Sequence, residues 1–299
     1  MGTEENAQNV VGIGLNPKFQ SNVLDCLHQY KNMNFDPEKI AENFLELSSE
    51  QRLKIIFNLL QKSYNISNMA KELEATSPEV HRNFTRMLKV GLVEKDSDGN
   101  FHLSTFGKTI CAQIPSIVFV SENKKFFENH NFGNIPEKFI HRIGELSEGK
   151  HIKGFVKVLE KWKQIHDNAE KYIYNVLSEV PYSKDIIDVV ENKLKNNIKI
   201  CSIFAQNAII PDERKMVFKI KGFDKYIKDG WLERKMIKSI SVVTLLNEKE
   251  ACMIFPKNNG EPDMSELFYS PDPHFHEWCL DYFNHCWECS SSFQEDKLQ

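Results

Sequence analysis

The sequence lacks a hydrophobic run long enough to cross a membrane: the apolar stretch at residues 114–120 is short and contains a proline. Its first twelve residues lack the basic start and the apolar core of a secretory signal. Seven cysteines, an odd number spread along the chain, do not suit a disulfide framework. These absences predict a cytoplasmic protein with reduced thiols and no membrane partner.

The sequence also lacks the short motifs of common catalytic and nucleotide-binding sites, which are G-x-S-x-G, G-K-S/T, G-x-G-x-x-G and H-E-x-x-H. His151 and Lys153 match the start of a phosphodiesterase motif, but no aspartate stands at the expected offset after them. We therefore predict that the chain is not an enzyme, that it has no catalytic residues, and that it needs no cofactor.

Histidine and cysteine side chains gather near the end of the chain, at His274, His276, Cys279, His285, Cys286 and Cys289. Imidazole and thiolate bind zinc, but a structural zinc site needs four ligands that converge in a tetrahedron, and one helix rarely presents four. The spacing matches no established zinc pattern. We predict no metal site, and expect the cysteines to act as small apolar residues.

The formal net charge of −4 is unevenly distributed along the chain. Residues 48–108 hold nine Lys or Arg and seven Asp or Glu and are the only net positive segment. Contacts between basic side chains and phosphates provide much of the affinity for nucleic acid. A segment with a charge of +2 should bind DNA weakly alone, so we expect a homodimer or a specific site to add affinity.

Residues 66–104 have the pattern of two helices joined by a sharp turn, followed by two short strands. Ser67 is expected to cap the first helix, residues 74–76 form the turn, and Ser77 caps the second helix ahead of Pro78. Gly91 ends the second helix, where a positive φ is expected. The apolar residues of the second helix recur at helical spacing and should face the core; they are Val80, Phe84, Met87 and Leu88.

The order helix, turn, helix and hairpin is that of a winged helix, whose second helix enters the major groove of DNA. The candidate DNA-binding residues lie on that helix and on the hairpin: Ser77, Glu79, His81, Arg82, Thr85, Arg86, Lys89, Lys95, Asn100 and His102. Arg82 is the best candidate for a base edge, because a guanidinium pairs bidentately with guanine. Glu79, His81 and Thr85 are expected to add base or phosphate contacts, and the others to hold the DNA backbone. Asp96 and Asp98 at the hairpin tip would repel phosphate.

Several stretches resemble known archaeal regulators. EVHRNFTRMLKVGLVEKD, at residues 79–96, closely resembles the recognition helix and first wing strand of archaeal winged-helix (ArsR-like) transcriptional regulators. IPEKFIHRIGEL and FHEWCLDYFNHCW, at residues 135–146 and 275–287, resemble the effector domain of FilR-type regulators, also called the methanogenesis regulatory domain. The resemblance spans about residues 48–290. It implies a transcriptional regulator with a C-terminal domain that senses a ligand or signal.

The remaining pattern completes the expected domain organisation. Before the winged helix, apolar spacing predicts a helix over residues 19–30 that forms a dimer arm or folds back on its own domain, and a helix at 49–62 whose inner face holds Leu53, Ile56, Phe57 and Leu60. After it, helices are expected at 155–177, 186–194 and 275–287, and strands at 197–204, 237–246 and 251–255. The expected parts are an N-terminal arm with helices (1–47), a winged helix-turn-helix (48–108), a linker helix (109–130) interrupted at Pro115, a sensor domain (131–290) and a flexible tail (291–299).

The sequence therefore predicts an α+β N-terminal winged helix-turn-helix followed by an α/β sensor domain. The predicted function is DNA-binding transcriptional regulation, with double-stranded DNA, a second copy of the chain and an effector of unknown identity as partners. The alternative is a winged-helix adaptor that docks on other proteins without reading DNA, because winged helices also serve that role.

Overall fold

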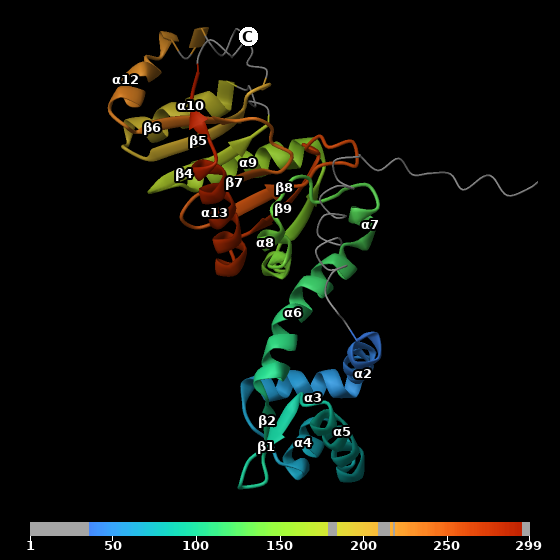
Figure 1. Ribbon diagram of the computed structural model, residues 1–299. Coiled ribbons are helices and arrows are strands. Elements are labelled where there is room, and N and C mark those ends of the chain that lie inside the picture. The colour runs from blue at the N-terminus through green and yellow to red at the C-terminus, as the bar shows by residue number, and fades with distance from the viewer. Residues whose placement is uncertain (1–35, 179–183, 209–215, 218, 295–299) are drawn as a thin grey trace, which may run out of the picture. The chain divides into compact units, whose positions relative to one another are not determined.

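The computed structural model describes residues 36–178, 184–208, 216–217 and 219–294. Within these residues the chain forms two compact units, which are residues 36–121 and residues 122–294 (Figure 1). The boundary falls inside the segment expected to be a linker. The helix expected at residues 19–30 lies outside the described residues.

The first unit contains five helices and a two-stranded hairpin among its described residues. These elements are α2 (Pro37–Leu47), α3 (Glu50–Gln61), α4 (Ile66–Glu72), α5 (Ser77–Lys89), β1 (Val93–Lys95), β2 (Phe101–Leu103) and α6 (Thr105–Glu122). The two strands pair antiparallel, with Glu94 opposite His102. The order of helix, turn, helix and hairpin expected over residues 66–104 is therefore present.

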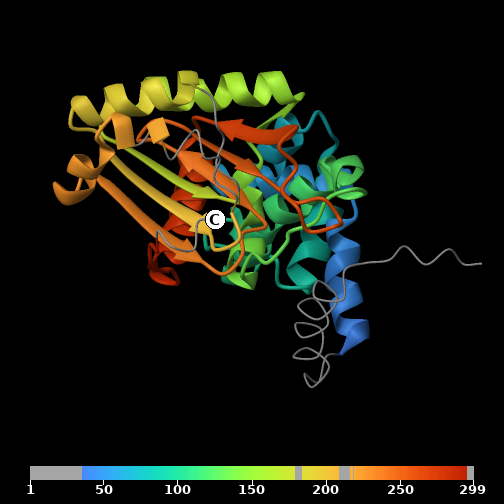
Figure 2. The same ribbon diagram turned by 90° about the horizontal axis from the view of Figure 1, so that it is seen from above.

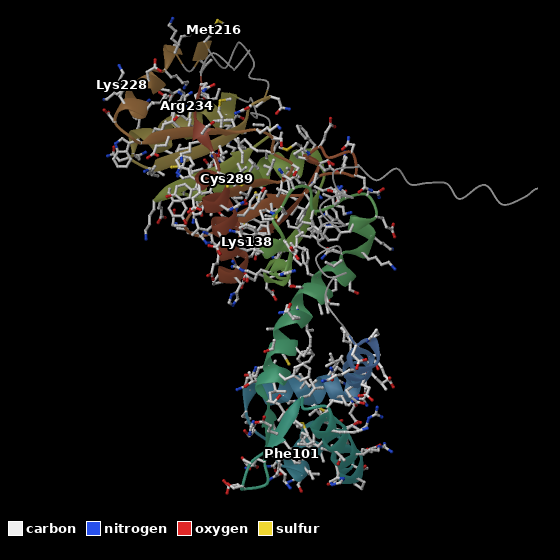
Figure 3. All side chains as sticks on the ribbon, viewed as in Figure 1. Phe101, Lys138, Met216, Lys228, Arg234 and Cys289 are labelled. Carbon is white, nitrogen blue, oxygen red and sulfur yellow. The ribbon has the colours of Figure 1, made fainter. Side chains whose placement is uncertain are left out.

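The core of this unit is apolar and lies between α3, α4, α5 and the hairpin. Phe101 of β2 lies in the lower part of Figure 3. Its ring stacks on that of Phe84 of α5, with ring centroids 4.0 Å apart. The most deeply buried side chains around this pair are Ile55, Ile56, Met69, Val80, Met87, Leu92, Val93 and Leu103. Leu88 was expected in the core but is 39% exposed, because it lies on the flank of α5 beyond Phe84.

The buried face of α3 differs from the face expected. Arg52, Ile55, Ile56 and Leu59 point inward, whereas Phe57 and Leu60 are 46% and 48% exposed. The buried polar residue Arg52 explains the error, because apolar periodicity cannot identify an inward face that begins with an arginine. α3 consequently has apolar side chains on two faces, and only one of them is buried.

The caps of α4 and α5 each lie before the residue expected. The side chain of Asn65 accepts a hydrogen bond from the backbone N–H of Asn68 at 2.9 Å, so α4 begins at Ile66 rather than after Ser67. Thr76 is the N-cap of α5, which makes Ser77 the first helical residue. At the other end, Gly91 follows α5 with φ +75°, as expected.

α6 follows the hairpin directly and is continuous from Thr105 to Glu122. Pro115 lies inside it, so the interruption expected there is absent; a proline removes one backbone hydrogen bond without necessarily ending a helix. Near its start, Gly107 packs against the backbone of Leu92. A Cβ on Gly107 would lie 2.1 Å from the Leu92 carbonyl oxygen, so this close approach requires glycine.

The second unit is built on a mixed eight-stranded sheet with the strand order β10-β6-β5-β4-β7-β8-β9-β3. Strands β4, β5 and β6 are parallel to one another, and the other neighbouring pairs are antiparallel. The strands are β3 (Lys150–Lys153), β4 (Tyr172–Leu177), β5 (Lys199–Ala205), β6 (Leu232–Ile237), β7 (Val243–Leu246), β8 (Ala251–Ile254), β9 (Glu266–Ser270) and β10 (Ser291–Ser292).

Helices cover both faces of this sheet. α9 (Phe155–Asn168) and α10 (Lys184–Lys195) lie along one face, and α13 (Pro273–Glu288) crosses the other (Figure 2). The shorter helices are α7 (Lys124–Phe127), α8 (Glu137–Ile140), the 3₁₀ turn η1 (Ile143–Leu146) and α12 (Phe223–Lys228). The helices expected at 186–194 and 275–287 are confirmed by α10 and α13.

Three expectations about this unit were wrong. The helix expected over 155–177 is α9 followed by β4, because the backbone turns at Ala169 into an extended conformation. The strand expected over 237–246 is confined to residues 243–246, and β6 lies earlier in the chain. Ser291 and Ser292, expected in a flexible tail, form an edge strand opposite Met236 and Lys235 of β6.

No helix among the described residues is both long enough and apolar enough to span a membrane.

Candidate nucleic-acid interface

The solvent-facing side of α5 presents a stripe of polar and basic side chains. Arg82, Thr85 and Lys89 are exposed and follow one another at spacings of three and four residues, which places them on one face of the helix. The opposite face holds the buried residues Val80, Asn83, Phe84 and Met87. Arg82 and Lys89 have no salt-bridge partner within the described part of the chain. Two positive charges without a salt bridge therefore stand on this stripe, and that of Arg82 interacts at longer range with Glu79.

A reciprocal cap fixes the start of α5. The carboxylate of Glu79 accepts hydrogen bonds from the backbone N–H of Thr76 at 2.9 Å and from its hydroxyl at 2.8 Å. These hydrogen bonds lower the pKa of Glu79, so the side chain stays negative. Glu79 is thus occupied in capping the helix, and Ser77 lies beside it as an exposed residue of the first turn.

Arg86 lies one turn after Arg82 on the side of α5 that faces α2. Its Nη2 and Nε bind the carboxylate of Glu46 at 2.7 and 3.0 Å, and its side chain is 44% exposed. Glu46 is buried and also binds Nε of Arg52 at 3.0 Å. The hydrogen bonds that Arg86 donates to Glu46 raise the pKa of Arg86. No local sequence pattern predicts this pair, because its two residues are 40 positions apart.

Two further candidates are placed by the helix itself. The hydroxyl of Thr85 donates to the carbonyl oxygen of His81 at 2.9 Å, so towards DNA it can only accept a hydrogen bond. His81 is exposed on the opposite flank of the stripe from Arg86. Behind the stripe, the amide of buried Asn83 donates to Gln51 of α3 at 2.7 Å, which ties α5 to its neighbour.

The hairpin tip is organised by Asp96. Its carboxylate accepts from the backbone N–H groups of Asp98 and Asn100 at 3.0 and 2.8 Å, and Gly99 adopts φ +86° in the turn. Asp98 is exposed. The carboxylate of Asp96 thus shapes the loop, and both acidic residues keep the tip negative, as expected.

The three hairpin candidates lie behind the tip. Lys95 is exposed, and its Nζ lies 5.6 Å from the centre of the Phe101 ring. Asn100 is half-buried beside the turn. The Nδ1 atom of His102 lies 3.3 Å from the carbonyl oxygen of Leu103. Among the described residues, Lys95 makes no salt bridge, like Arg82 and Lys89 of the α5 stripe.

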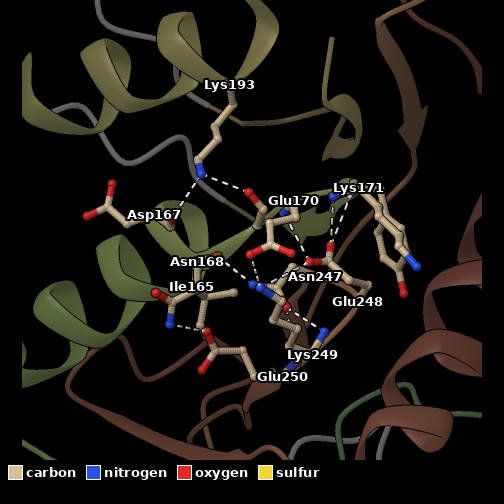
Figure 4. A network of polar contacts seen from close by, with 12 residues as sticks. Ile165, Asp167, Asn168, Glu170, Lys171, Lys193, Asn247, Glu248, Lys249 and Glu250 are labelled. Atoms are coloured by element: carbon tan, nitrogen blue, oxygen red, sulfur yellow. Dashed lines mark hydrogen bonds and ion pairs between the residues drawn. The ribbon is translucent and has the colours of Figure 1, made fainter. Parts of the chain in front are cut away.

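The second unit contains a buried polar network around the β7–β8 turn (Figure 4). Asn247 donates to the carbonyl oxygen of Ile165 at 2.7 Å and accepts from the N–H groups of Lys249 and Glu250. The carboxylate of Glu248 accepts from the backbone N–H groups of residues 170, 171 and 172 at 2.9, 3.0 and 3.4 Å. The hydrogen-bond partners of Asn247 and Glu248 lie in α9, in β4, in the segment between them and in the turn itself. The network therefore joins α9 and β4 to the turn.

A second polar group lies where residues 126–131 cross the β8–β9 connection. Nε2 of buried His130 binds the carboxylate of Asp263 at 3.1 Å, and Nδ1 of His130 contacts the carbonyl oxygen of Phe126 at 2.9 Å. Burial alone would raise the pKa of Asp263, but hydrogen bonds from Ser265 and His130 and the charge of Lys257 lower it to about 2. These contacts keep the carboxylate of Asp263 charged although the residue is buried.

His151 and Lys153, singled out by their H-x-K spacing, lie on β3 at one edge of the sheet. Both contact the carboxylate of Glu266 on β9, at 2.7 and 3.3 Å. Burial lowers the pKa of His151. In the region near the chain end, Cys279 and Cys286 are buried in α13, and no group of three or more potential metal ligands occurs among the described residues.

No protein-family model matches the sequence, and a comparison with curated proteins finds no relative. Among solved structures, the chain is similar to TrmBL2, an archaeal chromatin protein with a novel mode of DNA binding. The identity is 15% and the TM-score 0.38, over 80% of this chain and 92% of that one. It is also similar to a phosphatidylserine synthase from Haemophilus influenzae, at 10% identity and a TM-score of 0.38, over 50% and 41% of the two chains. A third match is the phospholipase D family member Nuc from Salmonella typhimurium, at 12% identity and a TM-score of 0.34, over 50% and 100%.

These comparisons correct the expectation that the chain is not an enzyme. The similar structures include a synthase, a phospholipase D family member and methyltransferases, at identities of 10–12% and TM-scores of 0.23–0.38. Likeness of this degree assigns no reaction to the residues of this chain.

Proposed function

We propose that the chain is a DNA-binding transcriptional regulator whose first unit acts as a winged helix. The observation that carries this proposal is the exposed stripe of Arg82, Thr85 and Lys89 on a capped helix whose other face is buried. In a winged helix the equivalent side of the second helix lies in the major groove. A guanidinium and an ammonium without acidic partners match the phosphates and the guanine edges found there.

The candidate residues take different roles in this proposal. Arg82 reads a base edge, and Thr85 accepts a hydrogen bond from an amino group of a base. Lys89, Lys95 and His102 contact phosphates. Glu79 holds the helix start rather than the DNA, because its carboxylate is already bound by Thr76. The negative hairpin tip disfavours deep entry into the minor groove.

We further propose that two copies of the chain bind together. Phe44 on α2 and Phe57 and Leu60 on α3 are 59%, 46% and 48% exposed, and α2 packs on α3. Exposed large apolar side chains on neighbouring helices are typical of surfaces that another protein covers. A second copy would also double the number of phosphate contacts, which the modest charge of one unit requires.

The sheet unit is proposed to sense a ligand or signal. What supports this role is the resemblance of residues 135–146 and 275–287 to an effector domain. A ligand would control DNA binding only by binding one form of the protein better than another.

A protein-docking adaptor is the second candidate. The specific observation in its favour is that the acidic hairpin tip and the exposed apolar side chains of α2 and α3 both suit a protein partner better than a phosphate backbone. The two candidates differ in their response to salt, because only contacts with DNA phosphates release condensed counterions.

The decisive experiment is fluorescence anisotropy of the full chain with a labelled duplex from its own upstream region, at several salt concentrations. A regulator binds this duplex more tightly than a random one, and log affinity falls linearly with log salt concentration. Lys89→Ala should reduce the slope by about 1. The matched control is Lys39→Ala on α2, an exposed lysine outside the stripe. Equal slopes for the two variants, or no binding by the unmodified chain, would refute DNA binding through α5.

A further inference from the structure

The contact between Glu46 and Arg86 joins the end of α2 to the exposed side of α5. Glu46 is 6% exposed, and its carboxylate is shared between two guanidinium groups. Arg52, the other partner, is 8% exposed and also donates to the carbonyl oxygens of Glu46 and Leu45 at 2.7 and 2.9 Å. One negative and two positive charges leave an excess charge of +1. That excess is accessible only through Arg86, because Arg52 and Glu46 are buried.

We propose that Glu46 is a positioning residue for DNA binding, which holds Arg86 ready to contact one backbone phosphate. This inference rests on the proposed function. Glu46 is a buried acidic residue of α2 and does not touch DNA in this arrangement. Its negative charge nevertheless raises the affinity for DNA, because it orients Arg86.

The geometry of Arg86 supports this role. Its Nε and Nη2 atoms face Glu46, so the carboxylate fixes the plane of the guanidinium. Nη1 takes no part in that contact, and among the described residues it donates no hydrogen bond. A guanidinium has five N–H donors in a rigid fork, so one edge can bind a carboxylate while another binds a phosphate. Fixing the side chain beforehand removes entropy that would otherwise be lost on binding.

The proposal opposes the simplest electrostatic expectation. Removing a negative charge from a DNA-binding unit should strengthen binding, because phosphate repulsion falls. If Glu46 positions Arg86, its neutralisation should weaken binding, since the guanidinium loses its fixed orientation. The sign of the change therefore separates positioning from bulk charge.

The test compares Glu46→Gln with Glu42→Gln in the full chain, by anisotropy on the upstream duplex. Glu42 lies one turn earlier on α2, is exposed, and changes the formal charge by the same amount. We expect Glu42→Gln to bind equally well or slightly more tightly. Glu46→Gln should bind about tenfold more weakly and lose about 0.9 from the salt slope, the value of one phosphate contact. Circular dichroism and thermal unfolding establish that each variant is folded at the assay temperature.

Because Glu46→Gln leaves Arg52 without its buried counter-charge, the variant risks unfolding. Arg86→Lys and Arg86→Gln provide the second measurement. A lysine keeps the charge but cannot bind the carboxylate bidentately, so positioning predicts that Arg86→Lys binds nearly as weakly as Arg86→Gln. A role based on charge alone predicts that Arg86→Lys binds as the unmodified chain does.

The outcomes distinguish this inference from the proposed function. Tighter binding by Glu46→Gln than by Glu42→Gln, or full affinity in Arg86→Lys, overturns the positioning role while DNA binding stands. Failure of the unmodified chain to bind any duplex overturns both. Weaker binding by Arg86→Lys, together with weaker binding by Glu46→Gln where that variant is folded, supports both, provided that Lys89→Ala has its expected effect.

Discussion

Arg82 and Arg86 stand one turn apart on α5, yet their side chains have different surroundings. Arg86 is bound by a buried carboxylate, whereas Arg82 has no acidic partner at salt-bridge distance within the described residues. An arginine without a partner can place its whole guanidinium against a guanine. Arg82 is thus the residue of the stripe whose loss should change sequence preference rather than affinity alone.

For Arg82→Ala we expect a loss of about 1–3 kcal/mol in binding free energy on the preferred duplex, and a smaller loss on a random one. The physical reason is the loss of a bidentate pair with a base. Lys95→Ala should weaken both duplexes by the same factor. Competition anisotropy with the two duplexes measures this ratio, and an unchanged ratio in Arg82→Ala would contradict a base contact.

Asp263 gives a prediction for the dependence of stability on pH. Its pKa is about 2 in the folded chain and 3.8 as the ordinary value. A depressed carboxyl pKa contributes stability that is present above the unfolded pKa and is lost as the pH falls through the folded pKa. The contribution of Asp263 should therefore disappear between about pH 4 and pH 2, and it amounts to about 2 kcal/mol.

Urea unfolding of the full chain at pH 6 and at pH 3 measures this contribution. Asp263→Asn should be less stable than the unmodified chain at pH 6, and the difference should shrink at pH 3. A difference of the same size at both pH values would show that the charge of Asp263 does not contribute, and that its hydrogen bonds alone are responsible.

At the scale of the element, the packing of α6 depends on the close approach of Gly107 to the backbone of Leu92, the residue before β1. Gly107→Ala would place a Cβ 2.1 Å from the carbonyl oxygen of Leu92, so the helix or the strand must move. The resulting loss of packing should destabilise the first unit by about 1–3 kcal/mol, although alanine is the better helix former. Thermal unfolding of the variant tests this, with the exposed position Ser121→Ala of the same helix as the control.

The boundary between α9 and β4 depends on the polar network of the β7–β8 turn. Asn247 is fully buried and makes three hydrogen bonds to backbone groups. Asn247→Ala leaves these groups without partners and should destabilise the second unit by about 2–4 kcal/mol. Chemical denaturation monitored by tryptophan fluorescence measures the change. A loss below about 0.5 kcal/mol would mean that water replaces the amide without cost.

The elements that could be predicted are those whose signals are local. The apolar residues of α5 recur within one helix, and Gly91 directly follows it, so the helix and its exposed stripe were evident from the sequence. The end of α9 was not evident, because Glu248 binds the backbone N–H of Glu170 from 78 residues away. Glu46 and Arg86 were missed as a pair for the same reason: a contact across 40 residues leaves no periodic signal.

On the scale of the whole molecule, the described residues form two units with separate cores. Domains of this kind unfold independently unless a large apolar interface couples them. A length of 299 residues exceeds that of a usual single domain and by itself favours two. The sequence did not indicate the order of strands in the sheet, because parallel pairing depends on segments that are distant in the chain.

We therefore expect calorimetry of the full chain to show two transitions. Gly107→Ala should lower the midpoint of one by about 4–8 °C for each kcal/mol, and Asn247→Ala the midpoint of the other by about 2–4 °C for each kcal/mol, because the second unit is the larger one. The two variants assign the transitions without separating the units. A shift of both midpoints by either substitution would show that the units unfold together.

The edge strand β3 has a consequence for how the molecule behaves in crowded solution. No strand lies beside its outer edge within the described residues, and a lysine stands at each end of Lys150–Lys153. An open edge is a template on which another sheet can add a strand, and positive charge along it makes approaching copies repel each other. Lys153 lies 3.3 Å from the carboxylate of Glu266, which offsets its charge, so Lys150 carries most of this repulsion. Acetylation of Lys150 would remove its charge and favour aggregation, and the homogeneity of a concentrated sample would then depend on one side chain at the rim of the sheet.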